Sequence, residues 1–84
     1  MRVQGEIDLD TVDELQRALS QAEGDVCLDL SEVTFLDSSG LRLLLGQHQA
    51  LAERGNRFEI AKPHPQVRRY LEISGLADRL DITD

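Results

Sequence analysis

The order of apolar and polar positions along the chain predicts strands and helices in alternation. Residues 2–7 fit a short strand with Val3 and Ile7 on one face, and Gly5 there is expected to bend the chain or relieve crowding. A helix follows, because apolar residues then recur every three or four positions until Gly24. Residues 26–30 fit a second strand, and its alternation predicts cover on both sides, since Cys27 lies opposite the apolar face.

The second half of the chain repeats this alternation. An apolar stripe after Gly40 predicts a helix that ends at Gly55, and residues 57–61 alternate as a strand. Pro65 fits the first turn of a third helix, which Gly75 ends, and residues 79–83 form a short strand or a last helical turn. The whole order, β-α-β-α-β-α-β, predicts an α/β fold with a mixed, mainly parallel sheet and helices packed against it.

Helix starts are marked by residues that favour N-caps. Asp10 and Thr11 each have an acid three residues on, which is the spacing of a capping box at the first helix. Before the second helix, Ser38 or Ser39 is expected to cap, and its replacement by alanine is expected to cost stability.

Composition narrows the class of protein. The chain has 84 residues, enough for one domain over residues 1–84. Sixteen acidic against nine basic residues give a net charge of −7, which argues against nucleic acid as a partner. A single cysteine excludes an internal disulfide, and no apolar run has the length of a signal peptide or a membrane span. We therefore expect a cytoplasmic protein without membrane insertion.

The segment Asp37-Ser38-Ser39-Gly40 is the candidate site, because it joins the end of an apolar strand to the start of a helix. Binding residues of α/β sheets gather at this edge. Free N–H groups of the helix start would tolerate a phosphate on either serine, whereas an aspartate beside it would repel one. An ordinary helix N-cap explains the same residues, so the pattern alone leaves both interpretations open.

A catalytic role for these serines lacks a base. His48 falls on the second helix and His64 in a proline-flanked turn, and spacing brings neither to the serines. The chain has no Gly-x-Ser-x-Gly elbow, no phosphate-loop lysine and no Cys/His spacing for zinc. We predict that the protein is not an enzyme and binds no cofactor or metal.

Five segments, spread in order over nearly the whole chain, together resemble a known family. They are Gly5-Glu6-Ile7-Asp8, Leu28-Asp29-Leu30-Ser31, Phe35-Leu36-Asp37-Ser38-Ser39-Gly40-Leu41, Val67-Arg68-Arg69 and Ser74-Gly75-Leu76. Together they resemble a STAS domain, and specifically the bacterial anti-sigma factor antagonists. The resemblance implies that Ser38, the first serine of the Asp-Ser-Ser-Gly motif, is phosphorylated by a partner anti-sigma factor serine kinase.

The resemblance also implies a mechanism of partner switching. The unphosphorylated chain would bind the kinase and free a sigma factor, the phosphorylated chain would let go, and a PP2C-type phosphatase would reset it. Asp37, Ser39, Gly40 and Leu41, with Asp8 from the Gly-Glu-Ile-Asp segment, would form the phosphoacceptor loop and the partner-binding surface. ATP would belong to the kinase, so this chain would be its substrate.

The resemblance leaves two questions open: how complete the domain is, and which function of the family it has. Family members usually begin with a further strand and often end with a further helix, so the chain is expected to be a minimal or truncated form. An edge strand left bare by that difference would favour a homodimer or an obligate partner. A second function on the same fold is a STAS subunit of an ABC-type lipid transport complex, which docks on an ATPase and needs no phosphorylated serine.

Overall fold

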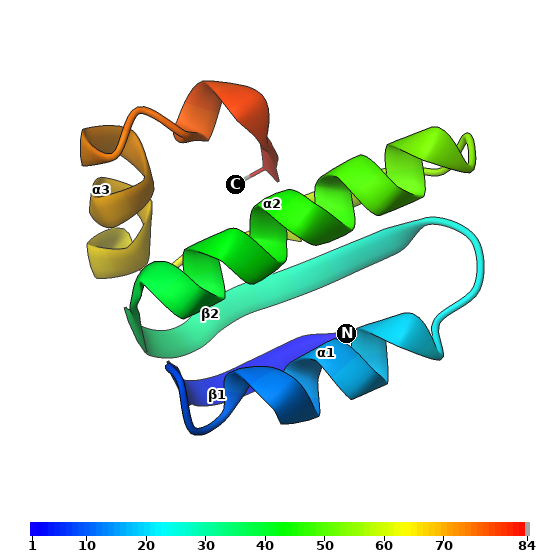
Figure 1. Ribbon diagram of the computed structural model, residues 1–84. Helices are drawn as coiled ribbons and strands as arrows, with labels where there is room; N and C mark the ends of the chain where they lie inside the picture. The colour runs from blue at the N-terminus through cyan, green and yellow to red at the C-terminus, as the bar shows by residue number, and fades with distance from the viewer. Residues whose placement is uncertain (84) are drawn as a thin grey trace.

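Four parallel strands form one sheet in the order β1-β2-β3-β4 in the computed structural model, which describes residues 1–83 (Figure 1). The elements in chain order are β1 (Arg2–Ile7), α1 (Val12–Ser20), β2 (Val26–Leu36), α2 (Ser38–Glu53), β3 (Phe58–Ala61), α3 (Pro65–Ile73), the 3-10 helix η1 (Ala77–Arg79) and β4 (Asp81–Thr83). The predicted α/β fold and the order of its elements are confirmed, and every strand pair described is parallel.

Strand β2 is longer and less regular than predicted. The two apolar stretches at 26–30 and 33–36 belong to one strand of eleven residues. Its pairing with β1 shifts twice, from Arg2↔Asp29 to Gln4↔Glu32 and from Gly5↔Val33 to Glu6↔Phe35, with one extra residue on β2 each time. Each bulge changes the face on which the following side chains lie. This is why the buried positions of β2 are Val26, Leu28 and Leu30 and then Val33 and Leu36.

The helices α1 and α2 lie over the same face of the sheet (Figure 1). Between them and the strands lies the apolar core, in which the largest fully buried side chains are Phe58, Ile7, Leu28, Leu30, Leu44, Ile60 and Leu71. The expectation that residues 26–30 are covered on both sides is wrong. Cys27 is exposed on the opposite face of β2, where Asp29 and Ser31 are only half-buried.

Helix α3 lies beside the carboxyl-terminal half of β2. Strand β3 pairs with Val26–Asp29 only, so β2 continues past its end. After β3, the chain makes one further backbone hydrogen bond to β2, in which His64 N donates to Leu30 O at 3.3 Å. Pro65 then begins α3, as predicted, and the helix contacts the remaining part of β2. This arrangement brings α3 next to the segment that carries the two serines.

Hydrogen bonds correct one local prediction, and backbone angles decide between the two alternatives of another. Thr11 is the N-cap of α1, but its hydroxyl makes no cap bond to the helix and instead donates to Glu6 O at 2.9 Å, so no capping box forms. Gly5 has a φ of +88°, and a Cβ there would meet nothing within 4 Å. Gly5 therefore serves a backbone conformation that other residues disfavour, not a crowded contact.

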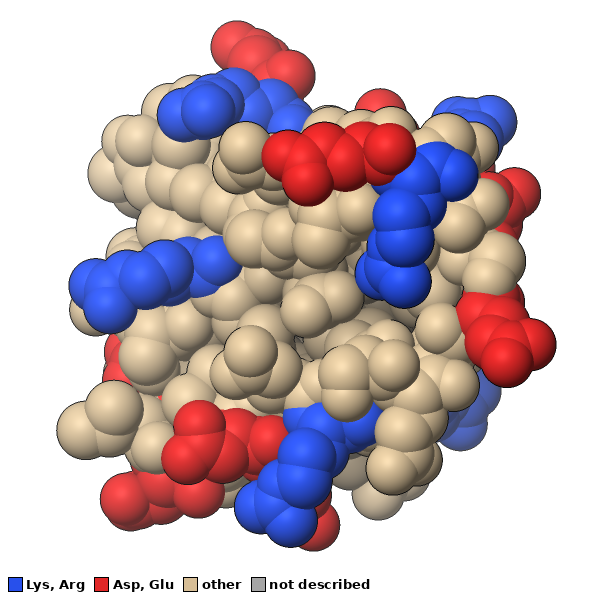
Figure 2. Space-filling model, turned by 45° about the vertical axis from the view of Figure 1, so that its right-hand side comes forward, with Lys and Arg blue, Asp and Glu red and all other residues tan. Residues whose placement is uncertain are grey.

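Charged side chains are scattered over the face drawn in Figure 2, where acidic and basic residues alternate around uncharged surface. Neither sign gathers into one continuous patch on that face. Among residues 1–83, no helix combines the length and the hydrophobicity that crossing a membrane requires.

Candidate functional site

The first turn of α2 is organised by the carboxylate of Asp37. This residue is the N-cap, with an extended backbone (φ −101°, ψ −172°). Its Oδ1 accepts hydrogen bonds from Ser39 N at 2.9 Å, Gly40 N at 3.1 Å and Ser39 Oγ at 2.5 Å. The expectation that Ser38 or Ser39 caps α2 is therefore wrong, because both serines already lie within the helix. Aspartate at this position satisfies two free N–H groups and places negative charge at the positive end of the helix.

The two serines have different environments. Ser39 is half-buried and its hydroxyl is held by Asp37. Ser38 is exposed, and the structure gives its hydroxyl no hydrogen bond with any residue in the range 1–83. Of the two hydroxyls, the one on Ser38 is therefore the one accessible from solvent.

The hydrogen bonds at the helix start lower the pKa of Asp37. The largest cause is the bond from the Ser39 side chain, followed by the backbone N–H of Gly40, and the backbone of Leu9 adds a smaller contribution. Partial burial acts in the opposite direction and does not cancel these bonds. Asp37 is thus a carboxylate at neutral pH, and its charge lies next to the Ser38 hydroxyl.

Gly40 allows α2 to approach the ends of β1 and β2. A Cβ at this position would lie 2.5 Å from Leu36 Cδ1, 2.7 Å from Ile7 Cγ2 and 3.2 Å from Ile7 O. The same region is tied by a bond from Asp37 N to Ile7 O at 3.1 Å. The glycine of the motif is therefore required by close packing, because its φ is not in the left-handed region.

Two residues predicted for the partner surface have other contacts. Leu41 is 8 % exposed and belongs to the core, so it supports the loop from beneath and offers a partner little surface. Asp8 Oδ1 accepts bonds from Asp10 N at 3.0 Å and Thr11 N at 3.2 Å, so its carboxylate holds the turn before α1. Asp8 does lie near the motif through the chain, since Ile7 beside it pairs with Leu36.

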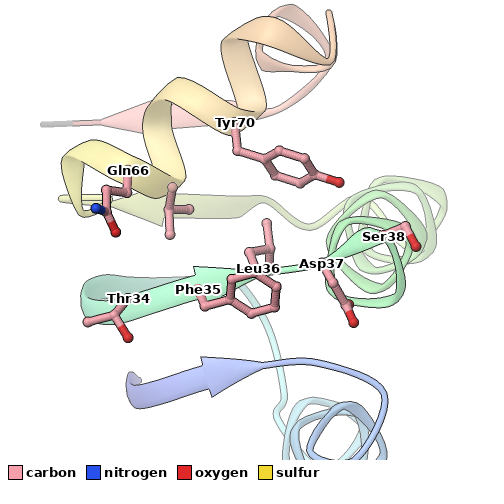
Figure 3. Close-up of a pocket in the computed structure, with 8 residues that line it drawn as sticks. Thr34, Phe35, Leu36, Asp37, Ser38, Gln66 and Tyr70 are labelled. Carbon is pink, nitrogen blue, oxygen red and sulfur yellow. The ribbon is translucent and has the colours of Figure 1, made fainter.

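A groove adjoins Ser38 on the side of α3 (Figure 3). It has a volume of about 430 Å³ and is lined by Thr34, Phe35, Leu36, Asp37, Ser38, Gln66, Val67 and Tyr70. The ring of Tyr70 reaches from α3 toward the first turn of α2, and Phe35 leaves 48 % of its surface exposed. Sequence reasoning missed the groove, because Phe35 and Tyr70 fit an apolar strand and an apolar helical stripe. The aromatic side chain of Phe35, two residues before Asp37 in the sequence, was the only available signal.

Other titratable groups have partners away from the serines. His48 Nε2 lies 3.6 Å from Asp81 Oδ2, and His64 Nδ1 accepts a bond from Gln66 N at 3.2 Å, where it caps α3. Within residues 1–83, no three His, Cys, Asp or Glu side chains come together in a group that could hold a metal ion. These contacts place neither histidine in a hydrogen bond with Ser38.

The sequence model of the family described as "Mlab, STAS domain" matches residues 1–83. The chain belongs to the STAS domain family. Its relatives include the anti-sigma F factor antagonist of Paenibacillus polymyxa, which is 30 % identical over 100 % of this chain and 76 % of the relative. The anti-sigma-B factor antagonist of Staphylococcus aureus is 32 % identical over 100 % of this chain and 82 % of the relative.

Solved structures show the same fold. The anti-sigma factor antagonist SpoIIAA, in its unphosphorylated form, superposes with a TM-score of 0.78 at 28 % identity, covering 99 % of this STAS chain and 76 % of SpoIIAA. A crystal structure from Thermotoga maritima superposes with a TM-score of 0.86, covering 96 % of this chain and 74 % of its own, and at 21 % identity it shows the fold alone.

Proposed function

We propose that this STAS domain is an anti-sigma factor antagonist whose binding is switched by phosphorylation of Ser38. The relatives named above are antagonists of anti-sigma factors, and they match this chain over its whole length. The observation that carries the proposal is the contrast between the serines: the Ser38 hydroxyl is exposed and free, whereas the Ser39 hydroxyl is bound to Asp37. The description of SpoIIAA as unphosphorylated supports a phosphorylated form in a similar protein.

The position of Ser38 allows a phosphate without loss of the fold. It is the first residue of α2, where the helix dipole favours negative charge. Arg42 lies four residues on, which is one helical turn away and within reach of a phosphate on the same face. Asp37 opposes these effects by repulsion, so phosphorylation is expected to change the surface far more than the folded core.

The same charge would disrupt a docked partner. Phosphate adds about −1.5 to −2 charges at neutral pH. On Ser38 it would lie beside the Asp37 carboxylate at the rim of the groove that contains Phe35 and Tyr70. A partner covering this groove would have to desolvate both charges, which favours its release. A kinase acting in trans, and a PP2C-type phosphatase that removes the phosphate, complete the cycle in the cytoplasm.

The antagonist function is favoured over a subunit of a lipid transport complex, because the curated relatives over the whole chain carry the antagonist name. The two functions differ in a simple respect. The antagonist needs a phosphoacceptor hydroxyl at Ser38, whereas the transport subunit does not.

Intact mass after incubation with ATP, magnesium and each anti-sigma kinase from the same genome tests the proposal. We expect the gain of one phosphate on the native chain and on Ser39→Ala, and none on Ser38→Ala. Ser39→Ala is the matched control, because it removes the neighbouring hydroxyl and leaves the acceptor. Circular dichroism of each variant establishes that it is folded.

Binding to the same kinase gives the second half of the test. The unphosphorylated chain is expected to bind, and the phosphorylated chain and Ser38→Asp are expected to bind at least tenfold more weakly. Absence of phosphate with every folded candidate kinase would exclude the switch. If phosphorylation left the affinity for the kinase unchanged, the modification would not cause partner release. That outcome would also contradict the mechanism.

A further inference from the structure

We propose that Arg42 binds the phosphate carried by Ser38, so that phosphorylation creates an ion pair within the first turns of α2. Such a pair rests on the proposed function, because it exists only after Ser38 is phosphorylated. The guanidinium would hold the phosphate in its fully charged form at neutral pH, which is the form that best opposes a docked partner.

The grooves on the two sides of the first turn of α2 are lined by few charges. The groove on the side of α3 contains Ser38, and Asp37 is the one charged residue among those described on its lining. A second groove, of about 430 Å³ between α1 and α2, is lined by Ser39 and Arg42, and its described lining contains no carboxylate. A phosphate on Ser38 would therefore be repelled by one neighbouring carboxylate and attracted by one neighbouring cation.

Arg42 has no counterion in the unmodified chain. Its side chain is exposed, and the structure gives it no ion pair with any residue in the range 1–83. The positions three and four residues before and after it, which are its neighbours on the helix surface, hold no acidic residue. The chain has 16 acidic residues, yet a phosphate on Ser38 would be the first anion to pair with Arg42 within the described part of the chain.

The geometry of the helix directs Arg42 toward Ser38. Arg42 follows Ser38 by four residues in α2, and side chains of a helix lean toward its N-terminal end. A pair with the anion first and the cation four residues later is also the more favourable order on a helix. Arginine suits a phosphate in particular, because its planar fork can donate two parallel hydrogen bonds.

The backbone at the helix start is already occupied by another anion. Asp37 Oδ1 accepts hydrogen bonds from Ser39 N at 2.9 Å and from Gly40 N at 3.1 Å. A phosphate could bind these N–H groups only by displacing the carboxylate that caps the helix. Binding by the Arg42 side chain requires no such displacement.

The ion pair would counteract the repulsion by Asp37. Phosphoserine loses its second proton at about pH 6. A carboxylate beside the phosphate favours retention of this proton, whereas a guanidinium favours its loss. Arg42 would thus keep the phosphate doubly charged at neutral pH despite the aspartate next to it.

A phosphorus NMR titration tests the proposal on the full chain, with phosphoserine placed at position 38 during synthesis so that no kinase is needed. Arg42→Gln is expected to raise the pH midpoint of the phosphate signal by about 0.3. Arg42→Lys keeps the charge and is expected to raise it less. Asp8 and Asp37, the acids nearest the acceptor in the turn before α1 and at the start of α2, are present in every variant, so their charges cancel in the comparison.

Arg54→Gln is the matched control for Arg42→Gln. It removes the same charge from an exposed arginine at the other end of α2. Arg54 is roughly 24 Å from Ser38 along the helix axis, which is well beyond the distance over which salt screens exposed charges. The midpoint of Arg54→Gln should therefore equal the native one.

Melting temperatures give an independent measurement of the same pair. Arg42→Gln should lower the melting temperature more in the phosphorylated chain than in the unmodified chain, because the ion pair exists only in the former. Arg54→Gln should have the same effect in both chains. Salt at about 1 M should reduce the difference seen for Arg42→Gln.

Two results would overturn the role of Arg42. One is an unchanged midpoint in Arg42→Gln, and the other is a shift of equal size in Arg69→Gln, which removes an exposed cation from α3. These results are distinguishable from failure of the proposed function. Absence of phosphorylation by every kinase would contradict the switch at Ser38, whereas an unchanged midpoint would contradict the phosphate binding by Arg42 alone.

Discussion

Ser39 Oγ donates to Asp37 Oδ1 at 2.5 Å, so the second serine of the motif and its aspartate form one structural unit. Ser38, between them in sequence, stays outside this unit with an exposed side chain. The motif thus divides its two hydroxyls between a structural role and a free one. Because of that division, the proposed phosphoacceptor Ser38 can be substituted without removing the hydrogen bonds of the helix start.

Ser38→Ala is expected to leave the free energy of unfolding within about 0.5 kcal/mol of the native value, as for most surface substitutions. Ser39→Ala removes a hydrogen bond to a carboxylate and is expected to destabilise by about 1.5 kcal/mol, the low end for such bonds. Urea denaturation followed by circular dichroism gives both values. A larger loss for Ser38→Ala than for Ser39→Ala would contradict the assignment of the two hydroxyls.

Gly40→Ala is expected to destabilise the fold by about 1–3 kcal/mol, because overpacking forces side chains or backbone to shift. The new Cβ would overlap with Leu36 and Ile7. Gly46 provides the matched control in the same helix, since a Cβ there would meet nothing within 4 Å.

For Gly46→Ala the expected change has the opposite sign. Alanine in an exposed helix interior is favoured over glycine by about 0.8–1 kcal/mol. Thermal melts of the two variants should therefore fall on opposite sides of the native melting temperature. If Gly40→Ala and Gly46→Ala changed the melting temperature equally, crowding against Ile7 would not explain the effect of Gly40→Ala.

The pH dependence of stability should report the charge of Asp37. Because its pKa is lower in the folded protein than the ordinary 3.8, the carboxylate stabilises the fold above that value and loses this contribution as the pH falls through the folded pKa. Asp37→Asn keeps an oxygen that can accept the cap bonds but does not titrate. The native chain should be more stable than Asp37→Asn at pH 7, and the difference should shrink below about pH 4.

Comparing these two proteins isolates Asp37 from other acids. Asp29 also has a lowered pKa, chiefly because Ser31 N donates to its carboxylate, but it titrates in both proteins and cancels in the difference. Urea denaturation at several pH values between 3 and 7 gives the two curves. A difference that stayed constant over this range would contradict the lowered pKa.

The sequence predicted the order of the elements because the apolar positions of each element have a clear period and because turn residues mark its end. Prolines and glycines ended or began the helices where expected, as Pro65 and Gly75 show for α3. The N-cap of the helix at the motif was predicted one or two residues late, because Asp37, Ser38 and Ser39 all suit an N-cap. Only the hydrogen-bond geometry distinguishes them.

Features that depend on pairing between distant segments could not be predicted. The bulges of β2 depend on its register with β1, and no local pattern reports a register that shifts twice. The 48 % exposure of Phe35 likewise belongs to the part of β2 that follows the second register shift, where Phe35 pairs with Glu6. The groove beside Ser38 joins residues more than thirty positions apart, so it required the fold.

Phe35→Ala is expected to weaken binding to the anti-sigma partner at least tenfold, because exposed aromatic side chains at the centre of an interface carry much of its energy. The ring is 48 % exposed in the groove beside Ser38, so its removal should cost the fold less than the loss of a buried phenylalanine. Ile73→Ala, at a side chain that is 74 % exposed and outside the groove, is the matched control. Titration calorimetry of both variants against the same kinase gives the affinities. Equal affinities for the two variants would place the partner on another surface, even if Ser38 proved to be phosphorylated.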